Sequence, residues 1–216
     1  QFDLKHKSSD LFWNLQYVWS RSYGNSEGGV KSDNEQTDTG VTTDFDFRAL
    51  TVGTEGYLPN DRRHVFKFFG SYNLTESLQV GLNSMLSSGR PISATGRGFP
   101  GAAAGYDFGY PGYGDTYYTC YRTSSTAPCT WNYHPRGDMG RTPWLFQLDA
   151  SLAYNFDIGG MSTRLVLDIF NLLDTDTMTK PEERYEVSLG NENQYYGYAK
   201  QWQPPRTVRL GLDVKF

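Results

Sequence analysis

The sequence has no long hydrophobic run. Only 38% of its 216 residues are hydrophobic, and the mean hydropathy is -0.60. No apolar stretch approaches the roughly 20 residues that a transmembrane helix needs. Any membrane span must therefore be a β-strand, whose alternating apolar and polar residues leave the mean hydropathy low. The low value does not exclude a membrane protein.

Basic clusters and catalytic groupings are also scarce. The formal net charge is -4, and the longest cluster that contains basic residues is Asp61–His64, which excludes the basic footprint of a nucleic-acid-binding protein. His6, His64 and His134 have neither the spacing of a metal site nor a nucleophilic partner. We expect surface or interface roles for them, and no enzyme, metal site or cofactor.

Two weaker patterns carry no function. Arg136–Asp138 reads Arg-Gly-Asp, the adhesion tripeptide, which we interpret as a chance match. A group of carboxylates could bind calcium, but their spacing is not that of an EF-hand, and a solvated acidic loop is the preferred interpretation. These carboxylates are Asp174, Asp176, Glu182 and Glu183.

The sequence is instead rich in aromatic residues and glycine, with Tyr 16, Phe 13, Trp 5 and Gly 23, a mixture that suits strands and turns. Its last stretch, Arg206–Phe216, has an apolar residue at every second position, which predicts a strand with one apolar face. A soluble protein rarely leaves such a strand uncovered at an edge, whereas a closed barrel has no edge. The apolar positions are Val208, Leu210, Leu212, Val214 and Phe216.

The same alternation recurs along the chain and predicts an all-β protein. Further strands are expected at residues 11–20, 65–74, 78–87, 144–156 and 164–170, and Leu4–Lys7 could be the tail of a preceding strand. No charged residue falls on any of the apolar faces. A lipid-facing surface would enforce this, because an Arg or Lys at the bilayer midplane costs roughly 2 to 4 kcal/mol.

Short turns alternate with long loops. The turns are expected at 75–77 and 157–161 and the loops at 21–61, 91–141 and 172–204, so that all the loops lie at one end of the sheet. Outer-membrane barrels have short periplasmic turns and long extracellular loops.

Aromatic residues on the apolar faces fit two interfacial girdles. Trp144 and Tyr154 lie ten residues apart on one face, which at a tilt near 45° gives about 23 Å of height, close to the apolar band of a barrel. A soluble β-sandwich also alternates but explains neither the loop asymmetry nor these aromatic residues. The predicted girdle residues are Trp13, Trp19, Phe66, Tyr72, Trp144 and Tyr154.

Several segments resemble the C-terminal part of TonB-dependent outer-membrane receptors: Phe66–Tyr72 running into Leu86–Pro91, then Leu167–Asp174, then a terminal strand that ends in Phe216. The segments 17–25 and 58–64 favour the Oar-like subgroup. The resemblance implies a barrel of about 22 strands with a plug domain and a TonB box, which imports scarce, bulky substrates such as iron chelates, cobalamin or glycans.

Residues 1–216 show about six of these strands, and neither a plug nor a TonB box. We therefore expect a C-terminal part of the barrel wall. Gln1 follows no start methionine or signal sequence, which favours a chain that starts partway through a longer protein.

The resemblance implies the outer membrane of a Gram-negative bacterium, with the long loops extracellular and the C-terminus periplasmic. The implied partners are outer-membrane lipid, the rest of the barrel and plug, the TonB complex and the outer-membrane assembly machinery, which would recognise the alternating residues of the terminal strand. The alternative is a small structural or adhesive barrel, in which extended arms at Val41–Leu50 and Tyr195–Gln203 add strands.

Two features of the second long loop suggest sites. Cys120 and Cys129 in an oxidising compartment favour a disulfide over metal binding or free thiols. A crowd of aromatic side chains suggests ligand contact, although the rings could equally pack the loop on itself. These residues are Tyr106, Phe108, Tyr110, Tyr113, Tyr117, Tyr118 and Tyr121.

Overall fold

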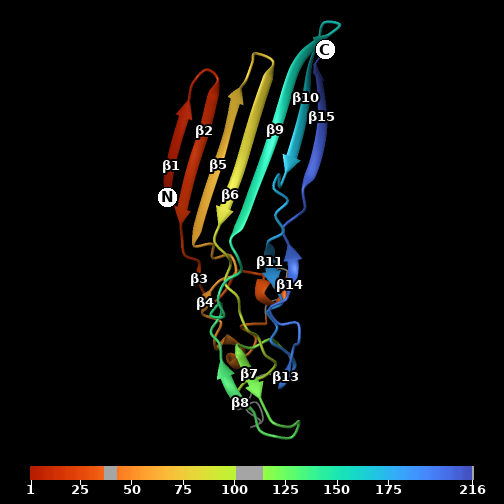
Figure 1. The fold of residues 1–216 in the computed structure, drawn as a ribbon. Coiled ribbons are helices and arrows are strands. Elements are labelled where there is room, and N and C mark those ends of the chain that lie inside the picture. Colours follow the sequence, from red (N-terminus) through yellow and green to blue (C-terminus); the bar gives the residue numbers. More distant parts are fainter. Residues whose placement is uncertain (37–42, 101–113, 216) are drawn as a thin grey trace.

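A computed structural model describes residues 1–36, 43–100 and 114–215. The molecule is elongated, with long strands at one end and the long loops gathered at the other (Figure 1). The regular structure of the described residues is almost entirely β, as the alternating sequence predicts. Among them, no helix is long and apolar enough to cross a membrane.

The long strands form one antiparallel sheet in which spatial order follows chain order. It has seven strands rather than about six, because the predicted tail before Ser8 is a full strand. The other strand bounds agree with the predicted ones to within a few residues. The strands are β1 (Phe2–Lys7), β2 (Leu11–Trp19), β5 (His64–Asn73), β6 (Leu78–Ser87), β9 (Leu145–Ile158), β10 (Met161–Phe170) and β15 (Thr207–Lys215).

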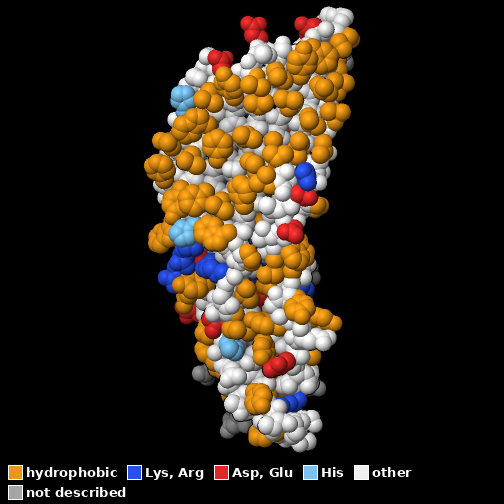
Figure 2. Space-filling view, in the orientation of Figure 1, with side chains coloured by type: hydrophobic (Ala, Val, Ile, Leu, Met, Phe, Trp, Pro, Cys, Tyr) orange, Lys and Arg blue, Asp and Glu red, His pale blue; other side chains and the backbone are white. Residues whose placement is uncertain are grey.

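The register joins the predicted apolar positions into a single face. Trp13 lies opposite Gly70, Gly70 opposite Leu82, Leu82 opposite Ala150, Ala150 opposite Ile169, and Ile169 opposite Val208. Figure 2 shows the resulting hydrophobic surface over the strands. Its side chains are exposed, with Trp19 at 62% and Leu210 at 70%. An apolar surface of this extent marks contact with a partner or a membrane.

The opposite face of the sheet carries the charged and most of the polar side chains, together with a few aromatic ones such as Phe69. Asn83 donates to Asp149 (3.2 Å), and Arg209 pairs with Asp168 (2.7 Å). Within the described residues, β1 pairs only with β2 and β15 only with β10, so that the sheet stays open at both edges and does not close into a barrel.

Short turns and long loops lie at opposite ends of this sheet (Figure 1). The turn between β9 and β10 is shorter than predicted, because the strands continue to Ile158 and from Met161. Gly159 (φ 57°) and Gly160 (φ 82°) form the turn in left-handed conformations that favour glycine.

The long loops contain regular structure that the sequence did not reveal. In the described part of the first loop lie the 3₁₀-helices η1 (Ser32–Asn34) and η2 (Arg48–Thr51). Among the described loop residues, four two-stranded sheets pair β3 with β4, β7 with β8, β11 with β14 and β12 with β13. Their strands are β3 (Tyr23–Gly24), β4 (Gly56–Tyr57), β7 (Tyr118–Tyr121), β8 (Thr130–Tyr133), β11 (Met178–Pro181), β12 (Glu186–Ser188), β13 (Asn191–Glu192) and β14 (Ala199–Trp202).

Neither expected arm adds a strand to the main sheet among the described residues. The prediction of an extended arm at Val41–Leu50 was wrong where it overlaps η2, because η2 is helical. Residues 41 and 42 of this arm lie outside the described ranges. The arm at Tyr195–Gln203 contains β14, but β14 pairs with β11 of the same loop. The local pairing is favoured because it closes a short segment instead of a distant one.

Candidate ligand-binding surface

The three long loops meet around one buried carboxylate, Asp33 of η1. Arg136 donates to both of its oxygens, at 3.0 and 2.8 Å, and the Tyr117 hydroxyl donates to Oδ2 at 2.9 Å. Arg136 also pairs with Glu27 at 3.0 Å. These contacts join the first loop to the second loop in the interior, where a charge is tolerated only if it is paired.

The charges around Asp33 decide its ionisation. Burial alone would raise the pKa of Asp33, but Arg136 and Lys31 outweigh burial and lower that pKa to about 2. Lys31 is itself fully buried and pairs with Asp44. The centre of the loop region is therefore a network of compensated charges.

The third loop joins this network through Glu183. Its carboxylate pairs with Arg90 and accepts the Ser93 amide at 2.8 Å, and the Ser93 hydroxyl donates to Asp33 at 3.3 Å. Burial raises the pKa of Glu183 to about 7 against the opposing charge of Arg90, and the Asp33 charge adds to the rise. The expectation of a solvated acidic loop was wrong for Glu183, which is buried because Arg90 lies opposite it.

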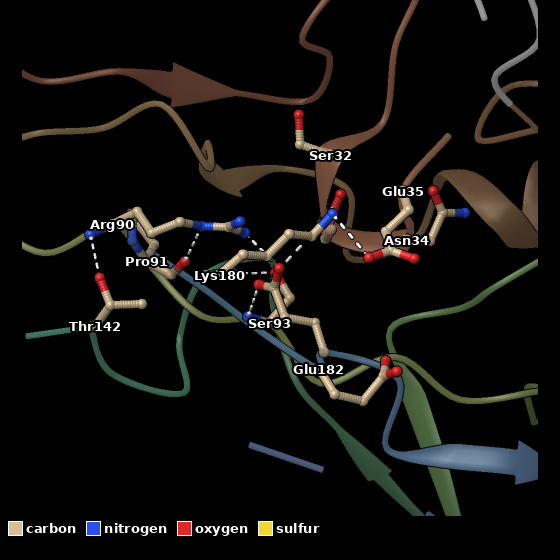
Figure 3. A network of polar contacts seen from close by, with 12 residues as sticks. Ser32, Asn34, Glu35, Arg90, Pro91, Ser93, Thr142, Lys180 and Glu182 are labelled. Carbon is tan, nitrogen blue, oxygen red and sulfur yellow. Dashed lines mark hydrogen bonds and ion pairs between the residues drawn. The ribbon is translucent and has the colours of Figure 1, made fainter. Parts of the chain in front are cut away.

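A partly exposed set of ion pairs connects the first and third loops beside this network (Figure 3). Lys200 pairs with Glu35 at 2.7 Å and with Glu182 at 3.1 Å, and Lys180 pairs with Glu35 at 3.4 Å. Asp174, another of the candidate calcium ligands, pairs with Arg206 instead. Among the described residues, no group of His, Cys, Asp and Glu side chains could hold a metal ion.

The backbones of the loops approach each other closely. A Cβ atom on Gly96 would lie 1.9 Å from the Tyr118 carbonyl oxygen, and one on Gly56 would lie 2.0 Å from the Arg136 carbonyl oxygen. Only glycine permits such contacts. The loop region is thus a packed unit that can hold side chains on its surface in fixed positions.

The clearest such surface is the β7–β8 hairpin, near the end of the loops farthest from the main sheet (Figure 1). The predicted disulfide between Cys120 and Cys129 is present and ties its two strands together. Tyr118 lies 5.1 Å from Tyr133 and 6.4 Å from Trp131, measured between ring centroids. Tyr133 remains 48% exposed. We name Tyr118, Tyr121, Trp131 and Tyr133 the aromatic hairpin.

The predicted ligand-contact residues have different locations. Tyr121 is 61% exposed, Tyr118 is partly buried in the aromatic hairpin, and Tyr117 is fully buried and bound to Asp33, which removes it from the surface. Trp131 and Tyr133 were missed, because the alternation across Thr130–Tyr133 extends over too few residues to stand out. The remaining candidates lie outside the described residues: Tyr106, Phe108, Tyr110 and Tyr113.

A second exposed aromatic group lies in the third loop. Tyr195 and Tyr198 meet edge to face with their ring centroids 6.0 Å apart, and both rings are largely exposed, as is Trp202. The sequence interpretation included these residues only as part of an extended arm.

The predicted girdle and terminal-strand residues lie on the apolar face. Trp19 is opposite His64 at the loop end, and the His64 ring stacks on Trp144. Tyr72 and Tyr154 lie toward the turn end, because they are opposite Val80 and Leu78. The girdle and assembly roles remain predictions, and Phe216 lies outside the described residues. Further members of this face are Trp13, Phe66, Val208, Leu210, Leu212 and Val214.

The other two histidines have ordinary contacts. The His6 ring stacks on Trp13, and the His134 ring lies 3.9 Å from the Asp138 carboxylate. Of the tripeptide interpreted as a chance match, Arg136 belongs to the buried network and is not available as a surface adhesion motif.

Comparison with known proteins gives one relative of named function. No family model matches the chain. The TonB-dependent transporter Oar of Myxococcus xanthus is 29% identical over 176 residues, which cover 79% of this chain and 14% of the relative. The chain thus spans about one seventh of the relative's length. This similarity supports a relationship to TonB-dependent receptors, in agreement with the all-β fold.

Proposed function

We propose that this chain is part of the wall of a TonB-dependent outer-membrane transporter that binds and imports a bulky, scarce substrate. The observation that carries the proposal is the seven-stranded sheet with an uncharged, exposed apolar face and all of its long loops at one end. A lipid-facing strand wall has this combination. The similarity to the TonB-dependent transporter of Myxococcus xanthus supports the part of the proposal in which import depends on TonB.

We infer the orientation from the loop lengths. The short turns and the C-terminus lie on the periplasmic side, and the three packed loops lie outside the cell. Trp19 and Trp144 mark the outer interface, and Tyr72 and Tyr154 mark the inner one, because aromatic rings with a polar edge prefer the membrane boundary.

Residues 1–216 form the C-terminal part of a larger barrel. In the described part of the chain, no strand pairs with the outer edge of β1 or of β15, and a membrane tolerates such edges only where another strand covers them. The rest of the barrel supplies that cover, a plug domain fills the barrel, and the TonB complex acts through the plug. The assembly machinery recognises the terminal strand.

Substrate contact falls to exposed aromatic side chains on the packed loops. Tyr121 and Tyr133 of the aromatic hairpin present large, rigid rings with polar hydroxyls, which suit sugars, peptides or chelates. The disulfide and the buried ion pairs already hold the loops in place, which reduces the conformational entropy that is lost on binding.

The test is energised uptake by the full-length protein. Cells that carry it, cells that lack it and cells that lack TonB are grown with iron chelates, cobalamin or glycans as the limiting source. We expect growth or uptake on one source that requires both the protein and TonB. Correctly inserted protein without TonB-dependent uptake of any source would contradict the proposal.

The second candidate is a structural or adhesive barrel, favoured by the stable, aromatic outer surface of the loops. It predicts adhesion that is lost with the protein but is unchanged in cells without TonB. The same three strains therefore separate the two functions.

A further inference from the structure

Four arginines gather where the apolar face ends and the loops begin. Arg21 follows β2, Arg62 and Arg63 precede β5, and Arg141 precedes β9. Figure 2 shows Lys and Arg side chains immediately beside the hydrophobic surface, on the same face of the molecule. We call Arg21, Arg62, Arg63 and Arg141 the rim arginines.

Three of these guanidinium groups surround the ring of Tyr57. The Cζ atoms of Arg21, Arg63 and Arg141 lie 5.1, 5.1 and 5.6 Å from its centroid. Arg62 is close enough to Arg141 and Arg90 that burial and these like charges lower its pKa. The cations are therefore held together at positions that their mutual repulsion disfavours.

The carboxylates that pair with the rim arginines do not balance the positive charge of the cluster. Asp61 pairs with Arg141 and with Arg63, and no ion pair joins Arg21 or Arg62 to a carboxylate within the described ranges. Among the described residues, Asp61 is thus the one carboxylate that forms an ion pair with any of the four cations. The buried Nε of Arg63 also has no hydrogen-bond partner among the described residues. The cluster has unused capacity for an anion with several acceptor oxygens.

We propose that the rim arginines bind the phosphate of an anionic lipid headgroup in the outer leaflet. Arg21 lies two residues after Trp19 and Arg141 lies three residues before Trp144, so the backbone at these two arginines lies about 5 Å beyond the edge of the apolar band. Lipid phosphates occupy that level. Guanidinium groups also match phosphate oxygens in pairs, more closely than an ammonium does.

This inference rests on the proposed membrane location, and its test separates the two. The full-length protein is purified in detergent, and native mass spectrometry counts the lipids retained after addition of phosphatidylglycerol or of phosphatidylcholine. We expect a preference for phosphatidylglycerol in the wild type. In R21Q/R63Q we expect the affinity for phosphatidylglycerol to fall by about tenfold. R21Q alone should show a smaller loss, and it keeps the Asp61 pairs.

The matched control is R206Q, which removes another arginine of the loop end that has its own carboxylate, Asp174. It should retain lipid as the wild type does. Equal retention by the wild type and R21Q/R63Q overturns the site. Displacement of the lipid by inorganic phosphate overturns the assignment to a headgroup and indicates a free-anion site.

A heat-modifiable band for each variant shows that the barrel has folded. A wild-type protein that does not insert into the outer membrane overturns this inference together with the proposed function. An inserted protein that lacks the lipid preference overturns this inference alone.

Discussion

Arg136 and Asp33 form a two-pronged ion pair across 103 residues of the chain, with Nε and one terminal nitrogen of the guanidinium at 3.0 and 2.8 Å from the two carboxylate oxygens. Both side chains are buried. The pair fixes the first long loop to the second, and the remaining contacts of the loop region are arranged around it.

Replacement of Asp33 by Asn should loosen the loops without unfolding the strands. The change leaves Glu27 as the one ion-pair partner of Arg136 among the described residues, and the loss of one member of a buried pair costs about 3 kcal/mol. Limited proteolysis of whole cells should cut the loops faster. The control is Asp174→Asn, which breaks an exposed pair and should change little. Equal cutting of both variants would contradict the central role of Asp33.

The pH dependence of the loops should have opposite signs on the two sides of about pH 4. The folded pKa of Asp33, about 2, is below its ordinary value, so its stabilisation of roughly 2 kcal/mol is present above pH 4 and is lost toward pH 2. The folded pKa of Glu183, about 7, is raised, so its contribution is present below about pH 4.5 and is lost toward pH 7.

Hydrogen exchange of the loop amides between pH 2 and 8 measures this dependence, after correction for the intrinsic exchange rate. Asp33→Asn should remove the change in loop protection below about pH 4, and Glu183→Gln should remove the change between pH 4.5 and 7. If both changes in protection persist in the variants, other titratable side chains cause them.

Reduction of the disulfide should release the aromatic hairpin. The bond closes a short loop with a sequence separation of 9, which is worth about 2 to 3 kcal/mol through the entropy of the unfolded segment. The unreduced protein should be lighter than the reduced one by two hydrogens, and Cys120→Ser/Cys129→Ser should expose the hairpin to protease. Detection of two free thiols in the native protein would refute the bond.

Removal of the exposed rings of the aromatic hairpin should weaken uptake. Tyr121→Ala/Tyr133→Ala is expected to lower the affinity for the substrate at least about fivefold, because truncation of a contacting ring costs about 1 kcal/mol or more. Val187→Ala removes an exposed apolar side chain elsewhere in the loops and serves as the control. Normal uptake by the double variant, at equal surface abundance, would mean that the rings only pack the loop.

A charge on the apolar face of β15 should impair assembly. Leu212→Arg places a cation in the lipid-facing band at a cost of roughly 2 to 4 kcal/mol. Gly211→Arg introduces the same side chain on the polar face, where the nearest atoms lie 4.0 Å from an added Cβ. We expect less heat-modifiable, inserted protein for Leu212→Arg than for Gly211→Arg, and also less after deletion of Phe216. Normal insertion of both the Leu212 and Phe216 variants would mean that this strand does not close a membrane barrel.

The strands could be predicted from the sequence because each one carries its own signal. Leu11, Trp13 and Leu15 alternate with polar residues within one strand, and the register of the neighbouring strands then follows from keeping such residues on one face. Only the tail of β1 was predicted, because this strand has few apolar residues and its exposed face includes His6.

The interior of the loops could not be predicted in this way. Asp33, Arg136 and Glu183 lie far apart in the sequence and show no period, and a buried ion pair leaves the same composition as a solvated one. The short sheets of the loops have strands of two to four residues, which are too short for an alternating pattern to stand out.

The main sheet has the same order in space as along the chain, so that no connection crosses another. Every pair between neighbouring strands is therefore independent of pairs farther along. Removal of a hairpin such as β5–β6 would bring β2 beside β9 in the same antiparallel sense, and the strand pairs outside the hairpin would stay as they are. A wall of this kind can change its circumference by two strands at a time, and so evolve barrels of different width from one repeated plan.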